Sequence, residues 1–252
     1  PHSGVDMIRL VVFDAYGTLF DFNSAVARHR DYVGPQADRL SDLWRAKQLQ
    51  YTWLRSLMGS YEPFSIVTQQ ALDHAMSALG IGSGDDALRQ GIRATLMDAY
   101  NTLDAFAEVP AMLKRLKFMG LRCAILSNGN PSMLEAAVDG AGLRGEFEPG
   151  GLLSVDAVRI FKPSPRVYQL VLDRFQGVAR EDVCFVSSNG WDAHAAAYFG
   201  FNSVWVNRGG ASAEGLPGSV RCELRDLSTL PELLNLATVK SSLSSLSSSP
   251  PS

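Results

Sequence analysis

Apolar and polar positions along the chain alternate between short β-type runs and longer helical patterns. The first run, residues 8–13, is apolar at nearly every position, which is typical of a strand buried on both faces of a parallel sheet. Similar apolar runs occur at residues 121–126, 152–155, 183–186 and 203–206, with helical patterns between them. This alternation predicts an α/β fold built on a doubly wound parallel sheet.

Between residues 21 and 103 the pattern is helical throughout. It predicts a first helix capped by Ser24, followed by helices over residues 40–58, 64–79 and 86–103. We expect these helices to form a cap domain inserted into an α/β core. The core domain would then consist of residues 7–20 together with residues 104–236.

The predicted helix over residues 40–58 is more apolar than one amphipathic face requires. One stripe of its surface comprises Leu40, Leu43, Trp44, Tyr51, Leu54 and Met58, and a second comprises Ala46, Leu49, Trp53 and Leu57. Exposed apolar surface of this extent is typical of a cleft or an interface. We therefore expect a homodimer in which part of this helix is buried by its twin.

Composition narrows the possible partners and the compartment. The 252 residues carry a net charge of -3 and are 46% hydrophobic and 19% charged, which describes an ordinary globular protein without a basic surface for nucleic acid. No apolar run is long enough to span a membrane. The three cysteines lack a CxxC spacing, which indicates no disulfide and a cytoplasmic location. Residues 1–6 and the Ser-rich segment 237–252 are expected to be tails outside the fold.

Short polar residues follow three of the predicted strands. They are Asp14, the pair Ser127-Asn128, and the triplet Ser187-Ser188-Asn189. Ser and Asn also occur simply as turn residues after strands. Because the carboxyl ends of parallel strands meet at one edge of a sheet, however, three such ends together favour a functional site there.

The stretch Phe-Asp-Ala-Tyr-Gly-Thr-Leu-Phe-Asp, residues 13–21, resembles the first motif of the haloacid dehalogenase superfamily, and specifically of its L-2-haloacid dehalogenase branch. The resemblance implies a Rossmann-like core with a helical cap, Asp14 as nucleophile and Thr18 as a catalytic partner. Phosphatases of this superfamily carry a second Asp two residues after the nucleophile, where it helps to hold magnesium. Here that residue is Tyr16, so the resemblance implies a site without metal or cofactor.

A second motif, Ile-Leu-Ser-Asn-Gly-Asn at residues 125–130, is similar to the family's clamp for the substrate carboxylate. By this resemblance Ser127 donates a hydroxyl to the carboxylate and Asn128 lies beside the departing halide. A serine nucleophile is an alternative, but Ser127 lacks the Gly-x-Ser-x-Gly elbow. The nearest histidine, His194, is expected to pack on its helix or face outward.

A third motif, Phe-Lys-Pro-Ser-Pro-Arg-Val-Tyr at residues 161–168, resembles the one that supplies the superfamily's lysine, here Lys162. A cation beside Asp14 would keep the nucleophile ionised. A surface salt bridge is the alternative role for Lys162, although its apolar neighbours favour a packed stem. The resemblance adds Tyr168 to the substrate site, whereas Ser164 departs from the usual Asp.

The fourth motif, Phe-Val-Ser-Ser-Asn-Gly-Trp-Asp at residues 185–192, resembles the dehalogenase form. The resemblance implies that Ser187, Asn189 and Asp192 position Lys162 and the hydrolytic water, with Asp192 as the base. Asp192 could also cap the following helix, and the two roles are compatible. Gly190 stands where the family pattern has alanine, which removes no functional group.

In the predicted cap, Leu-Trp-Arg-Ala-Lys-Gln-Leu at residues 43–49 matches the stretch that supplies the family's halide-binding arginine, here Arg45. The alternative is an ion pair on the cap surface. The pocket for the substrate's alkyl group is expected to be lined by Tyr16, Ala46, Leu49, Phe64 and Trp191.

These observations predict hydrolysis of short L-2-haloalkanoic acids to D-2-hydroxy acids and halide, through an ester on Asp14. One alternative is a magnesium-dependent phosphohydrolase on the same fold, which Tyr16 and Asn189 disfavour because they replace carboxylates that would hold the metal. The other is a catalytically silent protein that binds small acids.

Overall fold

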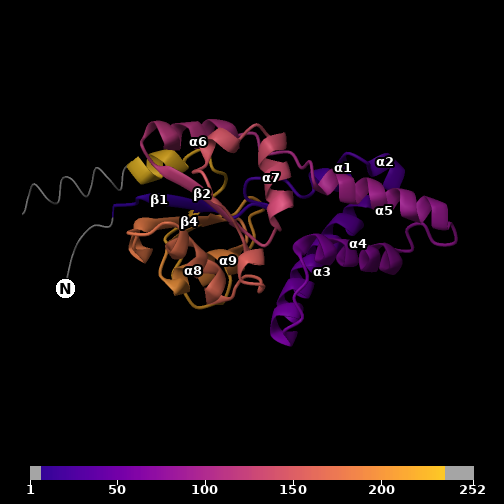
Figure 1. Cartoon of the computed structure of the whole chain (residues 1–252). Helices are drawn as coiled ribbons and strands as arrows, with labels where there is room; N and C mark the ends of the chain where they lie inside the picture. The colour runs from indigo at the N-terminus through magenta and orange to yellow at the C-terminus, as the bar shows by residue number, and fades with distance from the viewer. Residues whose placement is uncertain (1–6, 236–252) are drawn as a thin grey trace, which may run out of the picture.

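The computed structural model describes residues 7–235, which form a parallel sheet flanked by helices and a helical layer beyond one edge of that sheet (Figure 1). The sheet has six strands in the order β3-β2-β1-β4-β5-β6, all parallel. The strands are β1 (Leu10–Phe13), β2 (Arg122–Ser127), β3 (Leu152–Ser154), β4 (Val183–Ser187), β5 (Asn202–Val206) and β6 (Cys222–Leu224). The predicted doubly wound α/β fold is thereby confirmed.

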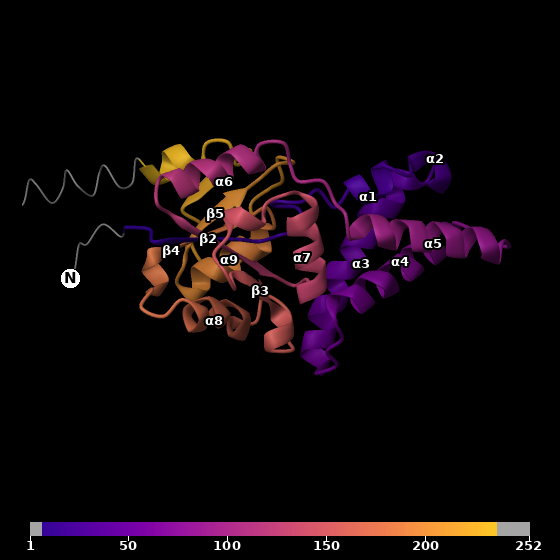
Figure 2. The same cartoon turned by 45° about the horizontal axis from the view of Figure 1, so that its top comes forward.

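Helices cover both faces of the sheet because its strands are apolar on both sides. The core helices are α6 (Val109–Phe118), α7 (Pro131–Gly140), α8 (Pro165–Arg174) and α9 (Gly190–Phe199). Helix α6 lies over one face, and α8 and α9 lie over the opposite face (Figure 2). Strand β1 is central, and all four of its side chains are buried.

The remaining helices lie together beyond the carboxyl ends of the strands (Figures 1 and 2). They are α1 (Ser24–Ala27), α2 (Arg30–Val33), α3 (Ala37–Met58), α4 (Phe64–Leu79) and α5 (Asp86–Tyr100). The chain leaves and re-enters the core through adjacent segments, since the Asp21 N–H donates to the Asp104 carbonyl at 2.8 Å and the Phe106 N–H to Leu19 at 3.0 Å. The predicted boundaries of the cap domain, near residues 21 and 103, lie beside these two hydrogen bonds. Both predicted tails, residues 1–6 and 237–252, lie outside the described residues.

Three predictions about the elements need correction. Asn23 occupies the N-cap position of α1 without a capping side-chain hydrogen bond, and Ser24 is the first residue of the helix, with its hydroxyl donating to the Asp21 carbonyl at 2.6 Å. The helix predicted to end at residue 103 ends at Tyr100. The strand β6 was not predicted, because its three residues include the exposed Glu223 and carry no apolar run.

Candidate active site

Asp14 lies directly after β1, between the carboxyl ends of β2 and β4. The strand register pairs Phe13 with Ile125 and Val186, so Ser127 and Ser187 end the neighbouring strands beside Asp14. The Asp14 N–H donates to the Val186 carbonyl at 2.9 Å, which fixes the backbone there. The predicted convergence of these strand ends is present in the structure.

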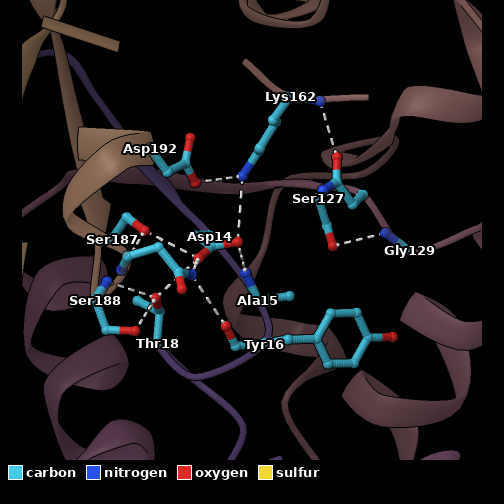
Figure 3. A network of polar contacts seen from close by, with 12 residues as sticks. Asp14, Ala15, Tyr16, Thr18, Ser127, Gly129, Lys162, Ser187, Ser188 and Asp192 are labelled. Carbon is cyan, nitrogen blue, oxygen red and sulfur yellow. Dashed lines mark hydrogen bonds and ion pairs between the residues drawn. The ribbon is translucent and has the colours of Figure 1, made fainter. Parts of the chain in front are cut away.

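The Asp14 carboxylate accepts hydrogen bonds on both oxygens (Figure 3). Its Oδ2 accepts from Thr18 Oγ1 at 3.1 Å, Ser187 Oγ at 2.9 Å and Asn189 Nδ2 at 2.7 Å. Its Oδ1 accepts from the Ala15 N–H at 2.9 Å and from Lys162 Nζ at 3.2 Å. These donors stabilise a negative charge and hold the carboxylate in one orientation.

A left-handed turn brings Thr18 back to Asp14. Gly17 has φ of 83°, a conformation that glycine adopts without strain, and an added Cβ would lie 2.9 Å from Phe22 Cε1. The Thr18 hydroxyl also accepts from the Ser188 N–H at 2.8 Å. Ser188 thus links the loop after β4 to the loop after β1, a role that its sequence position alone did not indicate.

Lys162 lies between two carboxylates and is buried, with a relative side-chain exposure of 1%. Its Nζ is 3.2 Å from Asp14 Oδ1 and 2.7 Å from Asp192 Oδ2. Burial alone would lower the pKa of Lys162, but the charges of Asp14 and Asp192 outweigh burial and raise this pKa above its usual value. The prediction of a packed stem is confirmed, and the surface salt bridge is excluded.

Asp192 is fully buried at the start of α9 and contacts Tyr168 as well as Lys162. The Tyr168 hydroxyl donates to Asp192 Oδ1 at 2.6 Å. Burial raises the pKa of Asp192 to about 6, although Lys162 and the Tyr168 hydrogen bond act in the opposite direction. Tyr168 lies behind Asp192 and does not line the catalytic cavity, so its prediction as a substrate contact needs correction.

Arg45 reaches the site from α3. Its guanidinium donates to Gln48 Oε1 at 2.9 Å and to Asn189 Oδ1 at 3.2 Å, and it lies 4.6 Å from the centre of the Phe22 ring. Asn189 therefore bridges Arg45 and Asp14 through the two ends of its amide. The alternative of an ion pair on the cap surface is wrong, because these partners are neutral and lie at the site.

The catalytic cavity encloses about 10 Å³, close to the space that one water molecule requires. It is lined by Asp14, Tyr16, Arg45, Leu49, Phe64, Ser127, Asn128, Lys162, Asn189 and Trp191. The Tyr16 ring lies 5.6 Å from that of Phe64, so the site has an aromatic wall. Ala46 is exposed and does not line the cavity, because the next residue on a helix points about 100° away from Arg45.

Backbone groups after β2 complete the cavity. The Gly129 N–H donates to Ser127 Oγ at 3.0 Å, and the Lys162 N–H donates to Asn128 Oδ1 at 3.0 Å. A Cβ on Gly129 would lie 2.9 Å from the Tyr16 ring, so a glycine is needed for this close approach.

His194 packs on its helix with Nδ1 2.9 Å from the Gly218 carbonyl, as expected for a histidine outside the site.

Sequence reasoning missed Gln48, which is buried and supports Arg45. Its amide nitrogen donates to Thr68 Oγ1 at 2.8 Å and to the Tyr100 hydroxyl at 3.0 Å. The available signal was its position three residues after Arg45, on the same face of a helix. Tyr100 lies 5.3 Å from Tyr16 between ring centres, and no local pattern indicated this contact between distant segments.

The donor set does not resemble a site for a divalent cation. Asp14 and Asp192 are separated by the Lys162 ammonium, and Tyr16 and Asn189 occupy positions where carboxylates would be needed. Within residues 7–235 no group of three or more His, Cys, Asp or Glu side chains is placed to hold a metal ion.

Comparisons with known proteins identify the family to which this chain belongs. The family model for haloacid dehalogenase-like hydrolases matches residues 8–200. The chain is therefore a member of the haloacid dehalogenase-like hydrolase family. Two individual members of known activity are similar to it over nearly its whole length. It is 44% identical to an (S)-2-haloacid dehalogenase from Pseudomonas sp. (strain YL), over 94% of this chain and 98% of that one. It is also 44% identical to (S)-2-haloacid dehalogenase 1 from Pseudomonas sp. (strain CBS-3), over 91% and 98% of the two chains.

One solved structure of similar fold contains a covalently bound ligand. The L-2-haloacid dehalogenase from Xanthobacter autotrophicus with chloropropionic acid covalently bound superposes with a TM-score of 0.79. It is 37% identical to this chain and covers 91% of this chain and 99% of its own. The chain therefore shares both its sequence and its fold with the dehalogenase branch of the family.

Proposed function

We propose that this protein hydrolyses short L-2-haloalkanoic acids to D-2-hydroxy acids and halide. The observation that carries the proposal is a buried carboxylate, Asp14, held by neutral donors and Lys162 at the wall of a small cavity that Arg45 enters from the cap. Its relatives of 44% identity are (S)-2-haloacid dehalogenases, which supports the same substrate class here.

In the first step an Asp14 oxygen attacks C2 of the substrate from the side opposite the halogen. A C–O bond forms, the carbon–halogen bond breaks, and the halide leaves with the bonding electrons, which inverts C2. Ser127 and neighbouring backbone amides hold the substrate carboxylate, while Arg45 and Asn128 meet the charge that develops on the halide. Tyr16, Leu49, Phe64 and Trp191 contact the alkyl group, and holding the reactants in line contributes up to about 7–11 kcal/mol.

In the second step water attacks the carbonyl carbon of the Asp14 ester. Asp192 is the carboxylate that remains beside Lys162 once Asp14 is esterified, and with a pKa of about 6 it is largely ionised at neutral pH. Asp192 accepts the proton of the water, and Ser187, Asn189 and Thr18 stabilise the oxygen of Asp14 as charge develops on it. Cleavage of the acyl–oxygen bond then releases the hydroxy acid, whose leaving oxygen takes up the proton from Asp192, and leaves C2 unaltered.

A single turnover in heavy-oxygen water tests this mechanism. If Asp14 is the nucleophile, the new hydroxyl oxygen comes from its side chain and solvent oxygen enters the carboxylate. With enzyme in excess over L-2-chloropropionate, the product should be largely unlabelled and the label confined to the peptide containing Asp14. Heavy oxygen in the first-turnover product, with Asp14 unlabelled, would instead show that water attacks C2 directly.

Turnover requires no metal in this proposal, because Lys162 supplies the positive charge beside the nucleophile. A divalent ion on Asp14 would reduce its nucleophilicity. Halide release should therefore be the same with and without excess EDTA. Loss of turnover in EDTA that magnesium restores would favour the phosphohydrolase alternative.

We also propose a homodimer and a cytoplasmic location. Leu54 and Met58 at the end of α3 are exposed, at 44% and 75%, and such an apolar patch is typical of an interface. The three cysteines Cys123, Cys184 and Cys222 are free, which fits a reducing compartment. Within the described residues no helix is long and apolar enough to cross a membrane.

A further inference from the structure

An apolar groove of about 620 Å³ lies next to the catalytic cavity, and Trp191 belongs to the walls of both. Helix α3 contributes Trp53, Ser56 and Leu57 to the groove, and α9 contributes Trp191, Ala195 and Tyr198. The described residues that line the groove include no charged side chain. A concave apolar surface of this size is typical of a binding site for an apolar group.

One face of α3 runs from the catalytic cavity into the groove. Arg45 and Leu49 line the cavity, whereas Trp53 and Leu57, one and two turns further on, line the groove. Residues four positions apart lie on the same face of a helix. Of the second apolar stripe predicted for this helix, Leu49, Trp53 and Leu57 therefore lie in line from the cavity to the groove, whereas Ala46 is exposed and lines neither.

Trp53 and Trp191 close this path where the cavity and the groove meet. Their ring centres are 5.2 Å apart with an interplanar angle of 87°, an edge-to-face contact. The Trp53 Nε1–H is buried and has no hydrogen-bond partner among the described residues. An unsatisfied buried donor is unfavourable, so this contact is one that Trp53 can leave without losing a hydrogen bond.

The closed cavity is too small for a substrate. Its volume of about 10 Å³ admits about one water molecule, whereas even 2-chloropropionate has six heavy atoms, so the cavity has to widen for any substrate. The alkyl group of a bound 2-haloacid would face Leu49 and Trp191, which are the residues nearest the groove. A longer chain would reach the groove only if the two tryptophan rings separate.

We propose that Trp53 and Trp191 form a gate, and that the groove binds the alkyl chain of medium-chain 2-haloalkanoic acids whose C2 lies at Asp14. This inference rests on the proposed function. Each methylene buried in the groove adds about fourfold to binding. The groove therefore determines how efficiently hexanoate and octanoate derivatives are used, and leaves the propionate derivative unaffected.

The test compares kcat/KM for L-2-chloropropionate, L-2-bromohexanoate and L-2-bromooctanoate. Ala195→Trp and Leu57→Trp fill the groove from opposite walls, outside the catalytic cavity. Ala136→Trp places the same side chain on the exposed face of α7 and serves as the matched control. Both groove variants should keep the activity on chloropropionate and lose at least about tenfold on bromooctanoate relative to it. The control should retain the wild-type ratio.

Several results would overturn the proposal. An unchanged octanoate-to-propionate ratio in both groove variants would show that the chain does not lie in the groove, as would a wild type that does not use bromooctanoate. A change in molar mass by light scattering in both groove variants would identify a second copy of the chain as the occupant. Failure of the wild type to release halide from chloropropionate would instead overturn the proposed function itself.

Discussion

Two carboxylates at the site, Asp14 and Asp192, have different roles because their surroundings differ. Asp14 faces the cavity and accepts from neutral donors as well as from Lys162. Asp192 is buried behind Lys162, with the Tyr168 hydroxyl as its other partner. The nucleophile is thus the carboxylate exposed to substrate, and the candidate base is the carboxylate withheld from it.

The pKa of Asp192 makes a prediction about pH. Because its pKa is raised to about 6, Asp192 becomes protonated below that pH, hydrolysis of the ester slows, and kcat should fall on the acid side. The Tyr168 hydrogen bond favours the ionised form, so Tyr168→Phe should raise this pKa and move the acid limb to higher pH. Tyr198→Phe, an exposed tyrosine on α9, is the control and should leave the profile unchanged.

The raised pKa of Asp192 also makes stability depend on pH, and here low pH is favourable. A carboxyl whose pKa is higher in the folded state than in the unfolded state binds protons more tightly when folded. Its favourable contribution to the free energy of unfolding is present below about pH 4 and is lost as the pH rises to about 6. Asp192→Asn should therefore show a weaker decline of the free energy of unfolding in this window than the wild type, measured by urea unfolding.

The pH dependence of the rate has its own contrary outcome. If Tyr168→Phe leaves the acid limb of the activity profile unmoved, Asp192 does not control the rate.

The role of Arg45 can be tested by a conservative substitution. Lys at this position cannot reproduce the contacts to Gln48 and Asn189 together, because an ammonium lacks the planar set of donors. We expect Arg45→Lys to lower kcat/KM by about a hundredfold to a thousandfold with little change in melting temperature. Arg55→Lys on the same helix, whose guanidinium bonds to Ser60 and Gln70, is the control. Equal activities of the two variants would place Arg45 outside the chemistry.

At the scale of elements, the strand ends could be predicted from sequence, whereas the contacts between distant elements could not. An apolar run that stops at Asp14 or Ser127 specifies both the strand and its functional end. Tyr168 was misplaced because the resemblance of its motif indicates that it lies near the site but not which residue it contacts. Gln48 was missed because a buried glutamine is recognised only through partners such as Tyr100, which lies 52 residues away.

The exposed end of α3 makes a prediction about assembly. Leu54 and Met58 are 44% and 75% exposed and lie one turn apart on the first of the two apolar stripes of this helix. Replacing both by Glu places two charges in a dimer interface, so light scattering should show a dimer for the wild type and a monomer for the variant. Leu88→Glu on α5, which is 40% exposed, should leave the mass unchanged. A monomeric wild type at micromolar concentration would refute the homodimer.

At the scale of the whole molecule, the cap closes over the sheet edge through polar contacts that cross between the two layers. The Phe161 N–H donates to Ser56 Oγ at 3.1 Å, and the Tyr61 hydroxyl bonds to the Asp156 carboxylate. Arg45 contacts Asn189 across the same boundary. These contacts hold Arg45, which we propose binds the halide, beside the Asn189 that contacts Asp14, and the free space at the site is that of about one water molecule.

A further contact between the cap and the core is a hydrogen bond at the start of a cap helix. Helix α4 begins after Pro63, which has no side chain to cap it, and the Ser65 N–H instead donates to Asn130 Oδ1 of the core at 3.1 Å. This hydrogen bond satisfies a free N–H at the helix start only when the cap is closed. Asn130 therefore stabilises the closed arrangement rather than the helix alone.

Asn130→Ala should weaken closure, because a lost helix cap costs about 1 kcal/mol, or about fivefold in the closing equilibrium. We expect kcat/KM for L-2-chloropropionate to fall by about that factor, with faster amide exchange in α4 at the boundary. Asp85→Ala is the matched control, since Asp85 caps α5 through the Leu88 N–H at 3.0 Å within the cap itself. The control should lose a similar amount of stability while keeping its activity. If both variants lost activity equally, the effect of Asn130 would be one of cap stability, and closure would not depend on this hydrogen bond.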